Sequence, residues 1–206
     1  MFKKLLGFIT KGDMLSVLIP VIVLVVVLST TTQGFLSAYN MQSLGRTVGV
    51  TTIVGFAQLV TLSIGHFNLA LGSMASISGV FTSALMEVYG VDIWIAILAG
   101  IVLGTIVGYI EGILIVKTGI NPFIITLSLS SIYLGLTIGL TRGVLYQKLP
   151  EAFKLIGKAN LLGIPLLFYI ALVISALLYV LMRKTVLGRQ LLATGANPRA
   201  AKILGI

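Results

Sequence analysis

The chain has 206 residues, of which 58% are hydrophobic and only 9% charged, and its mean hydropathy is +1.14. Soluble domains carry about 25% charged residues, so this chain has too few to cover a water-exposed surface, and we expect an all-α integral membrane protein. The absence of cysteine excludes disulfides and thiolate metal sites. The net charge of +9 does not indicate nucleic acid, because basic residues in a membrane chain set its orientation and meet anionic lipid.

Six apolar runs have the length of roughly 20 residues that a membrane-spanning helix needs. They cover residues 14–32, 47–64, 69–88, 93–116, 122–141 and 163–182. The first run follows three lysines, as a signal peptide would, but it is long for one and no A-x-A cleavage site follows it. We therefore expect an uncleaved first span and six transmembrane helices.

The distribution of lysine and arginine favours a cytoplasmic N-terminus. In that orientation the basic residues inside are Lys3, Lys4, Lys11, Lys117, Arg183, Lys184, Arg189, Arg199 and Lys202. Those outside are Arg46, Arg142, Lys148, Lys154 and Lys158. Four of the outer residues lie in one loop, 142–162, where Pro150 can begin a short amphipathic helix that rests on the membrane or receives a partner. Residues 183–206 are then cytoplasmic.

No catalytic constellation is present in the sequence. Five acidic residues and one histidine are the only classical acid–base groups, and H-E-x-x-H, G-x-S-x-G and G-x-x-x-x-G-K-[ST] do not occur. We expect no catalytic residue, no metal and no cofactor. ATP hydrolysis that drives this protein would come from another chain, so the sequence favours transport or scaffolding.

The fourth apolar run carries glycines at a spacing of four: Gly100, Gly104, Gly108 and Gly112. At about 100° per residue these form one slanting stripe, which predicts close helix packing. Glu111 falls inside the same arc and so faces protein. An intramembrane carboxylate is a candidate functional group, although an interfacial or hydrogen-bonded structural role is the alternative.

Polar residues also interrupt the connection between the second and third runs, which reads "SIGHFNLALGSMASISG". Non-helical backbone at membrane depth requires a protein or aqueous surrounding, so this stretch is a candidate lining for a polar solute. The candidate pathway residues are His66, Asn68, Ser73, Ser76 and Glu111. The alternative is a plain cytoplasmic hairpin followed by a serine-rich helix.

The last residues, "TGANPRAAKILGI", predict a short capped helix over 198–204. Asn197 is a good N-cap, Pro198 a good first residue and Gly205 a good terminator. About two turns of helix are too short to be stable alone, so the helix should dock on another surface. Its alanines and its basic rim favour a partner protein, and a position on the membrane surface is the rival interpretation.

Four motifs together resemble the membrane permeases of bacterial ABC importers in the ribose, xylose and galactose group. They are "GHFNLALGSMASISG", "NPFIITLSLSSIYLGL", "LPEAFKLIGKANLLGIP" and "RKTVLGRQLLATGANPRAAKILGI". In that family the last motif is the cytoplasmic loop that couples the permease to its ATP-binding subunit. The resemblance assigns coupling to Gly188, Arg189, Gly195, Asn197, Arg199, Ala200, Ala201 and Gly205.

The chain departs from the family pattern at three positions. The family motif is G-G-I-D-L-S-x-G-S. In this chain His66 stands in place of its second glycine and Asn68 in place of its aspartate. Glu111 stands where a small polar residue such as asparagine is usual. Family members also continue past this point, so we expect a single permease domain over 1–206 that is the N-terminal part of a longer chain, with the coupling loop at 183–206.

The resemblance implies import of a monosaccharide through the bacterial cytoplasmic (inner) membrane by a multi-pass permease subunit. Its implied partners are a cytoplasmic ATP-binding subunit, an external solute-binding protein, a second permease subunit and membrane lipid. The alternatives are the same architecture for a nucleoside, a branched-chain amino acid or a furanose signal, and an ion-coupled carrier that uses Glu111.

Overall fold

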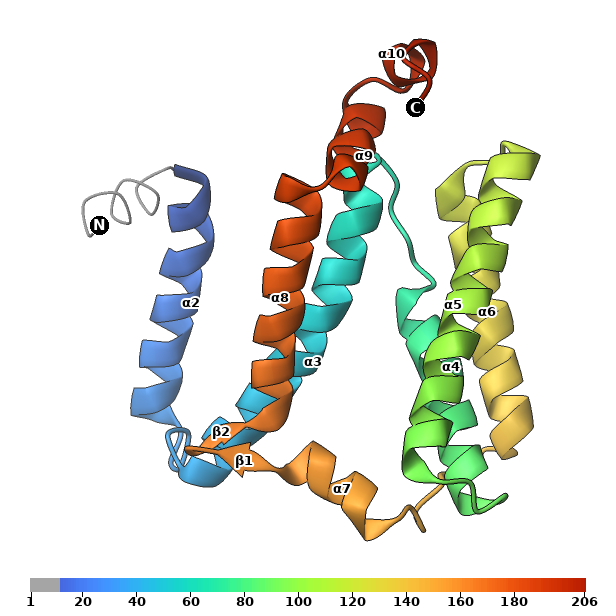
Figure 1. Cartoon of the computed structure of the whole chain (residues 1–206). Helices are drawn as coiled ribbons and strands as arrows, with labels where there is room; N and C mark the ends of the chain where they lie inside the picture. The colour runs from blue at the N-terminus through green and yellow to red at the C-terminus, as the bar shows by residue number, and fades with distance from the viewer. Residues whose placement is uncertain (1–11) are drawn as a thin grey trace. The chain divides into compact units, whose positions relative to one another are not determined.

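A computed structural model describes residues 12–206 of the chain (Figure 1). The chain divides into two compact units, Met1–Gly45 and Arg46–Ile206. In the first unit, helix α2 (Gly12–Thr31) covers most of the first apolar run. Its large apolar side chains from position 15 onward are mainly exposed, as lipid-facing side chains would be. Lys3, Lys4 and Lys11, which we place on the cytoplasmic side, lie outside the described residues.

Helix α3 (Ala38–Ser63) crosses the boundary between the units, and the other described elements lie in the second unit. They are α4 (Leu71–Glu87), α5 (Ile93–Thr118), α6 (Pro122–Thr141), α7 (Glu151–Lys158), β1 (Asn160–Leu161), β2 (Ile164–Pro165), α8 (Leu166–Lys184), α9 (Val186–Ala196) and α10 (Pro198–Ile203). The described residues are therefore mainly helical, and their only strands form one small hairpin.

Within the described part of the chain, three helices are long and apolar enough to cross a membrane: α5, α6 and α8. The described apolar part of α2, Leu15–Thr31, is shorter, and so is α4. Helix α3 is long enough but more polar, and it begins at Ala38 rather than at residue 47. The predicted start is late because hydropathy detects only the apolar run, whereas the polar residues before position 47 belong to the same helix.

The ends of α5 and α6 follow from local capping chemistry. The side chain of Asp92 accepts a hydrogen bond from the backbone N–H of Trp94 (2.9 Å), and Asn121 does the same for Phe123 (2.9 Å). Gly119 ends α5 in the left-handed conformation, with φ 63°. Because Pro122 follows the Asn121 cap, α6 begins where the sequence predicts, and its bounds equal the predicted ones.

Helices α4, α5 and α6 form one packed group, in which α4 contacts both neighbours (Figure 1). The small core of this group contains Ala70, Ile77 and Tyr133, with Met74, Val107 and Leu129 packed against it. Most other large side chains on these helices are exposed. Apolar residues on the outside and small residues at the contacts are typical of helices that pack in lipid.

Helix α8 connects the remaining elements of the second unit. It packs against α7, β2 and α9, and α9 in turn packs against α10. The backbone of α3 approaches α8 at Gly49, where an added Cβ would lie 2.9 Å from the carbonyl carbon of Leu167. The hairpin pairs Asn160 with Pro165 and Leu161 with Ile164 in antiparallel register. Our sequence analysis did not predict this hairpin, because two-residue strands are too short to show an alternating pattern.

Candidate functional site

The connection between α3 and α4, residues 64–70, is not helical and is held by Asn68. The side-chain Oδ1 of Asn68 accepts a hydrogen bond from the backbone N–H of Ala70 (2.7 Å), while its Nδ2 donates to Oε1 of Glu111 on α5. With its amide oriented so that both groups pair, Gln58 of α3 donates to the carbonyl of Asn68 (2.9 Å) and accepts from its N–H (3.2 Å). One residue therefore links α3, the connection and α5.

Glu111 lies in the interior of the helix group, with only 3% of its surface exposed. Its Oε1 accepts from Asn68, whereas its Oε2 is buried and has no hydrogen-bond partner among the described residues. The glycine arc of α5 predicts that this side chain faces protein, and the structure places it there. An incompletely satisfied buried carboxyl group is costly, so its position calls for a functional explanation.

A cavity of about 590 Å³ lies beside this polar group. Its lining includes His66, Asn68, Glu111, Thr61, Thr126 and Thr194, together with apolar residues of α4, α5 and α6 and Leu191 of α9. The structure thus brings together three of the five candidate pathway residues: His66, Asn68 and Glu111. A mostly apolar cavity with a few convergent polar groups is typical of small-molecule sites.

The other two candidates, Ser73 and Ser76, do not line this cavity. The Ser73 hydroxyl donates to the carbonyl of Ala70 (2.9 Å), and the Ser76 hydroxyl donates to that of Gly72 (3.0 Å). Both bonds stay within the first turns of α4 or its cap. Ser76 lines a second, separate cavity of about 410 Å³ beside α6.

Three of the four glycines in the α5 stripe face α4. An added Cβ would collide with the hydroxyl of Thr82 at Gly100, would lie 3.1 Å from Ser78 Oγ at Gly104, and would lie 3.2 Å from Met74 Cε at Gly108. At Gly112 no atom lies within 4 Å of the added Cβ. The close contact therefore covers the first three glycines, because α5 extends past the N-terminal end of α4 by Gly112.

The candidate coupling segment 183–206 contains two helices rather than the single predicted one. Thr185 caps α9, where its hydroxyl accepts from the N–H of Gly188 (3.2 Å). Asn197 caps α10, where its Oδ1 accepts from the N–H of Ala200 (3.1 Å). Helix α10 ends at Ile203, one residue before the predicted end. Sequence reasoning missed α9 because its polar residues hide the periodicity, although Thr185 is a visible N-cap signal.

The eight candidate coupling residues fall into two groups. Gly188, Gly195 and Ala201 face the chain's own interior: an added Cβ at Gly195 would collide with the carbonyl oxygen of Ser63, and one at Gly188 with that of Leu181. The remaining residues are exposed: Arg189, Asn197, Arg199, Ala200 and Gly205. Any partner docking here meets the second group, while the first group lets α9 approach α3 and α8.

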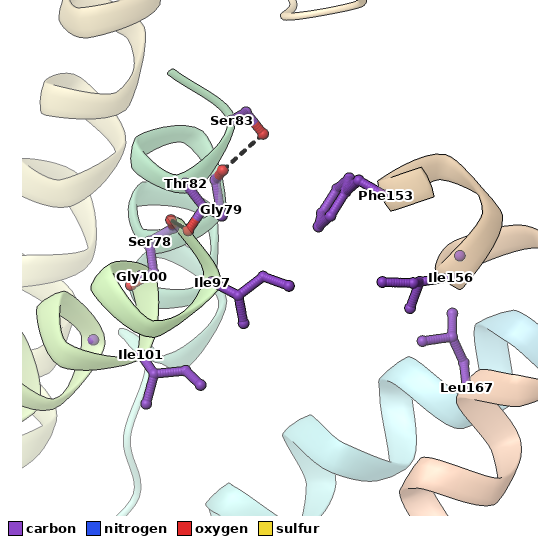
Figure 2. Close-up of a pocket in the computed structure, with 12 residues that line it drawn as sticks. Ser78, Gly79, Thr82, Ser83, Ile97, Gly100, Ile101, Phe153, Ile156 and Leu167 are labelled. Atoms are coloured by element: carbon purple, nitrogen blue, oxygen red, sulfur yellow. Dashed lines mark hydrogen bonds between the residues drawn. The ribbon is translucent and has the colours of Figure 1, made fainter. Parts of the chain in front are cut away.

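The loop between α6 and α8 is tied to the helix group through Glu87. The backbone N–H of Lys148 donates to Oε2 of Glu87 at the end of α4 (2.8 Å). On α7, Lys154 forms an ion pair with Glu151 at 2.9 Å, and this hydrogen bond is the main reason why the pKa of Glu151 lies below its usual value of 4.5. Phe153 and Ile156 of α7 point into a groove of about 690 Å³ that is also lined by Ile97 and Leu167 (Figure 2).

The sequence did not identify Gln58 as a partner of Asn68, nor Thr61, Thr126 and Thr194 as lining residues of the cavity beside Glu111. A single polar residue within a helix is a weak signal without the fold. Among the residues that the structure describes, no three histidine, cysteine, aspartate or glutamate side chains form a group that could hold a metal ion.

Comparison with known proteins gives a family and several relatives. Residues 40–206 match the family described as "Branched-chain amino acid transport system / permease component". The ribose import permease protein of Bacillus subtilis (strain 168) is 31% identical over 186 residues, which cover 89% of this chain and 58% of that protein. The D-allose transport system permease protein of Escherichia coli (strain K12) is 29% identical over 179 residues, 86% of this chain and 55% of that protein.

A third relative is the L-arabinose transport system permease protein of Escherichia coli (strain K12), 29% identical over 194 residues, which cover 94% of this chain and 59% of that protein. The chain thus spans somewhat more than half the length of these relatives. No solved structure gives a significant match.

Proposed function

Because the chain belongs to the family of permease components that serves branched-chain amino acid and simple-sugar ABC importers, we propose that it forms part of a monosaccharide importer driven by ATP. It is a multi-pass protein of the bacterial inner membrane. One observation carries the choice of solute: relatives that align with 86–94% of this chain are named for ribose, allose and arabinose.

In this proposal the permease crosses the membrane six times, with its N-terminus in the cytoplasm. An external binding protein delivers the solute on the side of α7, and two permease subunits enclose the pathway. The cavity beside Asn68 and Glu111 supports a polar pathway near the cytoplasmic ends of α3 and α5. ATP hydrolysis takes place in a separate subunit, and alternating access requires that ATP bind one conformation better than the other.

The exposed part of α9 and α10 is the proposed surface for the ATP-binding subunit. Arg199 and Lys202 are exposed, and so are the apolar side chains of Ile203 and Leu204. A basic rim around exposed apolar residues supports a protein contact, and six helical residues do not hold their fold without tertiary contacts. Inside this surface, Gly195 places α9 directly on the end of α3, next to the connection that Asn68 holds.

The test is uptake by proteoliposomes that contain the complete transporter with its ATP-binding and solute-binding proteins. We expect uptake of labelled ribose, arabinose or allose that requires both ATP and the binding protein. Uptake of leucine or of a nucleoside instead would change the solute but keep the mechanism. Uptake that a proton or sodium gradient drives without ATP would contradict the proposal and favour an ion-coupled carrier using Glu111.

The coupling surface is tested in the same assembly by the variant Arg199→Glu with Lys202→Glu. The reversed charge should reduce retention of the ATP-binding subunit in a pull-down by roughly tenfold or more, since removing charged contacts costs about 1–3 kcal/mol each. Lys154→Glu with Lys158→Glu makes the same charge change on the outer loop and is the control. Equal retention of the subunit by both variants would show that α10 does not hold it.

A further inference from the structure

The tip of the β1–β2 hairpin combines a strained backbone with an exposed leucine. Leu162 and Gly163 form its two-residue turn, with φ of 53° and 81°. Such a turn favours Asn, Asp or Gly at the first position, and a leucine there is a backbone outlier. The side chain of Leu162 is nevertheless 92% exposed, the largest value among the large apolar residues that the structure describes. No packing within the described chain explains a leucine at this position.

The hairpin is fixed next to the start of a membrane span. The N–H of Leu166, the first residue of α8, donates to the carbonyl of Ala159 (2.8 Å). The hydroxyl of Tyr169, one turn into α8, donates to the carbonyl of Leu161 (3.3 Å). Helix α8 is apolar and long enough to cross the membrane. The hairpin therefore cannot move far from the point where the chain enters the bilayer.

The short distance along the chain limits where Leu162 can lie. The four residues from Leu162 to Leu166 span at most about 14 Å when fully extended, and a hairpin spans less. The headgroup region on one side of a bilayer is roughly 5–8 Å thick. The hairpin tip consequently lies within or beside the lipid headgroups of this face.

The residues around the tip have the chemistry of a lipid interface. Leu161 and Ile164 are also exposed, and exposed apolar side chains continue along α8, for example at Leu172 and Val173. The preceding loop carries four basic residues, Arg142, Lys148, Lys154 and Lys158, against one acidic residue, Glu151. Apolar side chains with a basic surround are typical of interfacial anchors.

Helix α7 is not the element that enters the lipid. Two of its three large apolar side chains, Phe153 and Ile156, are half-buried and point into the groove toward α5 and the start of α8 (Figure 2), whereas Leu155 is exposed. The amphipathic pattern of α7 is thus used against the protein. Within the loop, the hairpin tip carries the most exposed large apolar side chain, Leu162.

We propose that the β1–β2 tip, with Leu162 at its centre, inserts into the lipid interface on the side of the membrane where α6 ends and α8 begins. Its partner is the bilayer surface. The insertion fixes the height of the external loop relative to the membrane, and it explains why a leucine occupies a position where glycine would be unstrained. The proposal rests on α8 as a membrane span and not on the identity of the solute.

The chain contains no cysteine, so a single introduced cysteine can be labelled specifically. Leu162→Cys, carrying a nitroxide, is reconstituted in vesicles of phosphatidylcholine with and without phosphatidylglycerol. Collision rates are measured with oxygen, which concentrates in lipid, and with a water-soluble nickel chelate. Glu151→Cys on the exposed face of α7 is the aqueous control, and Leu172→Cys on α8 is the lipid control.

We expect the ratio of oxygen to nickel collisions at position 162 to exceed the ratio at 151 by severalfold and to approach that at 172. A ratio at 162 equal to that at 151 in both vesicle types would overturn the proposal. Protection of position 162 only after an external binding protein is added would overturn it as well, because the tip would then be a protein contact. Leu162→Trp combined with Trp94→Phe, read by brominated-lipid quenching, gives an independent measurement.

Discussion

At the scale of single residues, Asn68 and Glu111 determine how the connection between α3 and α4 is held. Both are positions at which the chain departs from the family pattern, and the structure joins them by a hydrogen bond. The resemblance implies a carboxylate at position 68 and often a small polar residue at 111, whereas this chain has an amide at 68 and a carboxylate at 111. Both arrangements contain one carboxylate, but in this chain residue 111 carries it instead of residue 68.

This pairing predicts that the two positions are coupled. Asn68→Asp should destabilise the chain by about 1–3 kcal/mol, because a second carboxyl group would then face the buried carboxyl group of Glu111 and the amide hydrogen bond between them would be lost. Asn68→Asp with Glu111→Asn restores one carboxylate and one amide, and should recover most of this loss. The measurement is thermal and denaturant unfolding in detergent.

Asn121→Asp is the matched control, because Asp caps a helix about as well as Asn. It makes the same substitution at the exposed start of α6. If the stability losses of the two single substitutions simply add in the double variant Asn68→Asp with Glu111→Asn, then the two side chains do not interact.

At the scale of elements, the contact between α9 and α3 depends on one missing side chain. Gly195 lies against the backbone of α3, where an added Cβ would be 2.9 Å from the carbonyl carbon of Ser63 and 3.2 Å from the Cα of Ile64. Backbone atoms of a helix end cannot move aside cheaply. The chain thus positions α9, and with it α10, by a backbone contact instead of by interlocking side chains.

Gly195→Ala should therefore lower the free energy of unfolding by about 1–3 kcal/mol, as overpacking of a well-packed contact does. Gly112→Ala is the control, because it also lies in a helix but has no neighbour within 4 Å of the added Cβ. That control should be neutral or stabilising by up to about 1 kcal/mol, the difference in helix propensity between glycine and alanine. Thermal unfolding of both variants in the same detergent measures the difference, and equal stability would contradict the close contact.

At the scale of the whole molecule, the orientation predicted from lysine and arginine places α7 and α10 on opposite sides of the membrane. Helix α8 is the apolar helix that separates them. In the cysteine-free chain, Lys158→Cys should react with a membrane-impermeant maleimide from outside intact cells. Arg199→Cys should react only after the membrane is made permeable.

Labelling of both cysteines from the same side would mean that α8 does not cross the membrane. The opposite pattern, with Arg199→Cys reactive from outside, would invert the orientation. Tyr39→Cys at the start of α3 extends the measurement, because it should be external if α2 is also a span.

The sequence by itself determined the membrane class, the helical architecture and the family, because these depend on composition, on apolar length and on motifs that lie close together in the chain. It also predicted the bounds of α6, since Asn121 and Pro122 act on the residues next to them. The inward position of Glu111 followed from helical periodicity alone. The last two conclusions depend only on residues within a few helical turns of each other.

The tertiary structure alone decided which distant residues meet. Asn68 and Glu111 are 43 positions apart, and Ser63 and Gly195 come from opposite ends of the second unit. It separated Gly188, Gly195 and Ala201, which face inward, from the exposed residues of the candidate coupling segment, and it placed Leu162 at a hairpin tip. Local sequence patterns do not predict such contacts, because the same glycine or polar residue can contact its own chain, a partner or lipid without any change in the residues next to it.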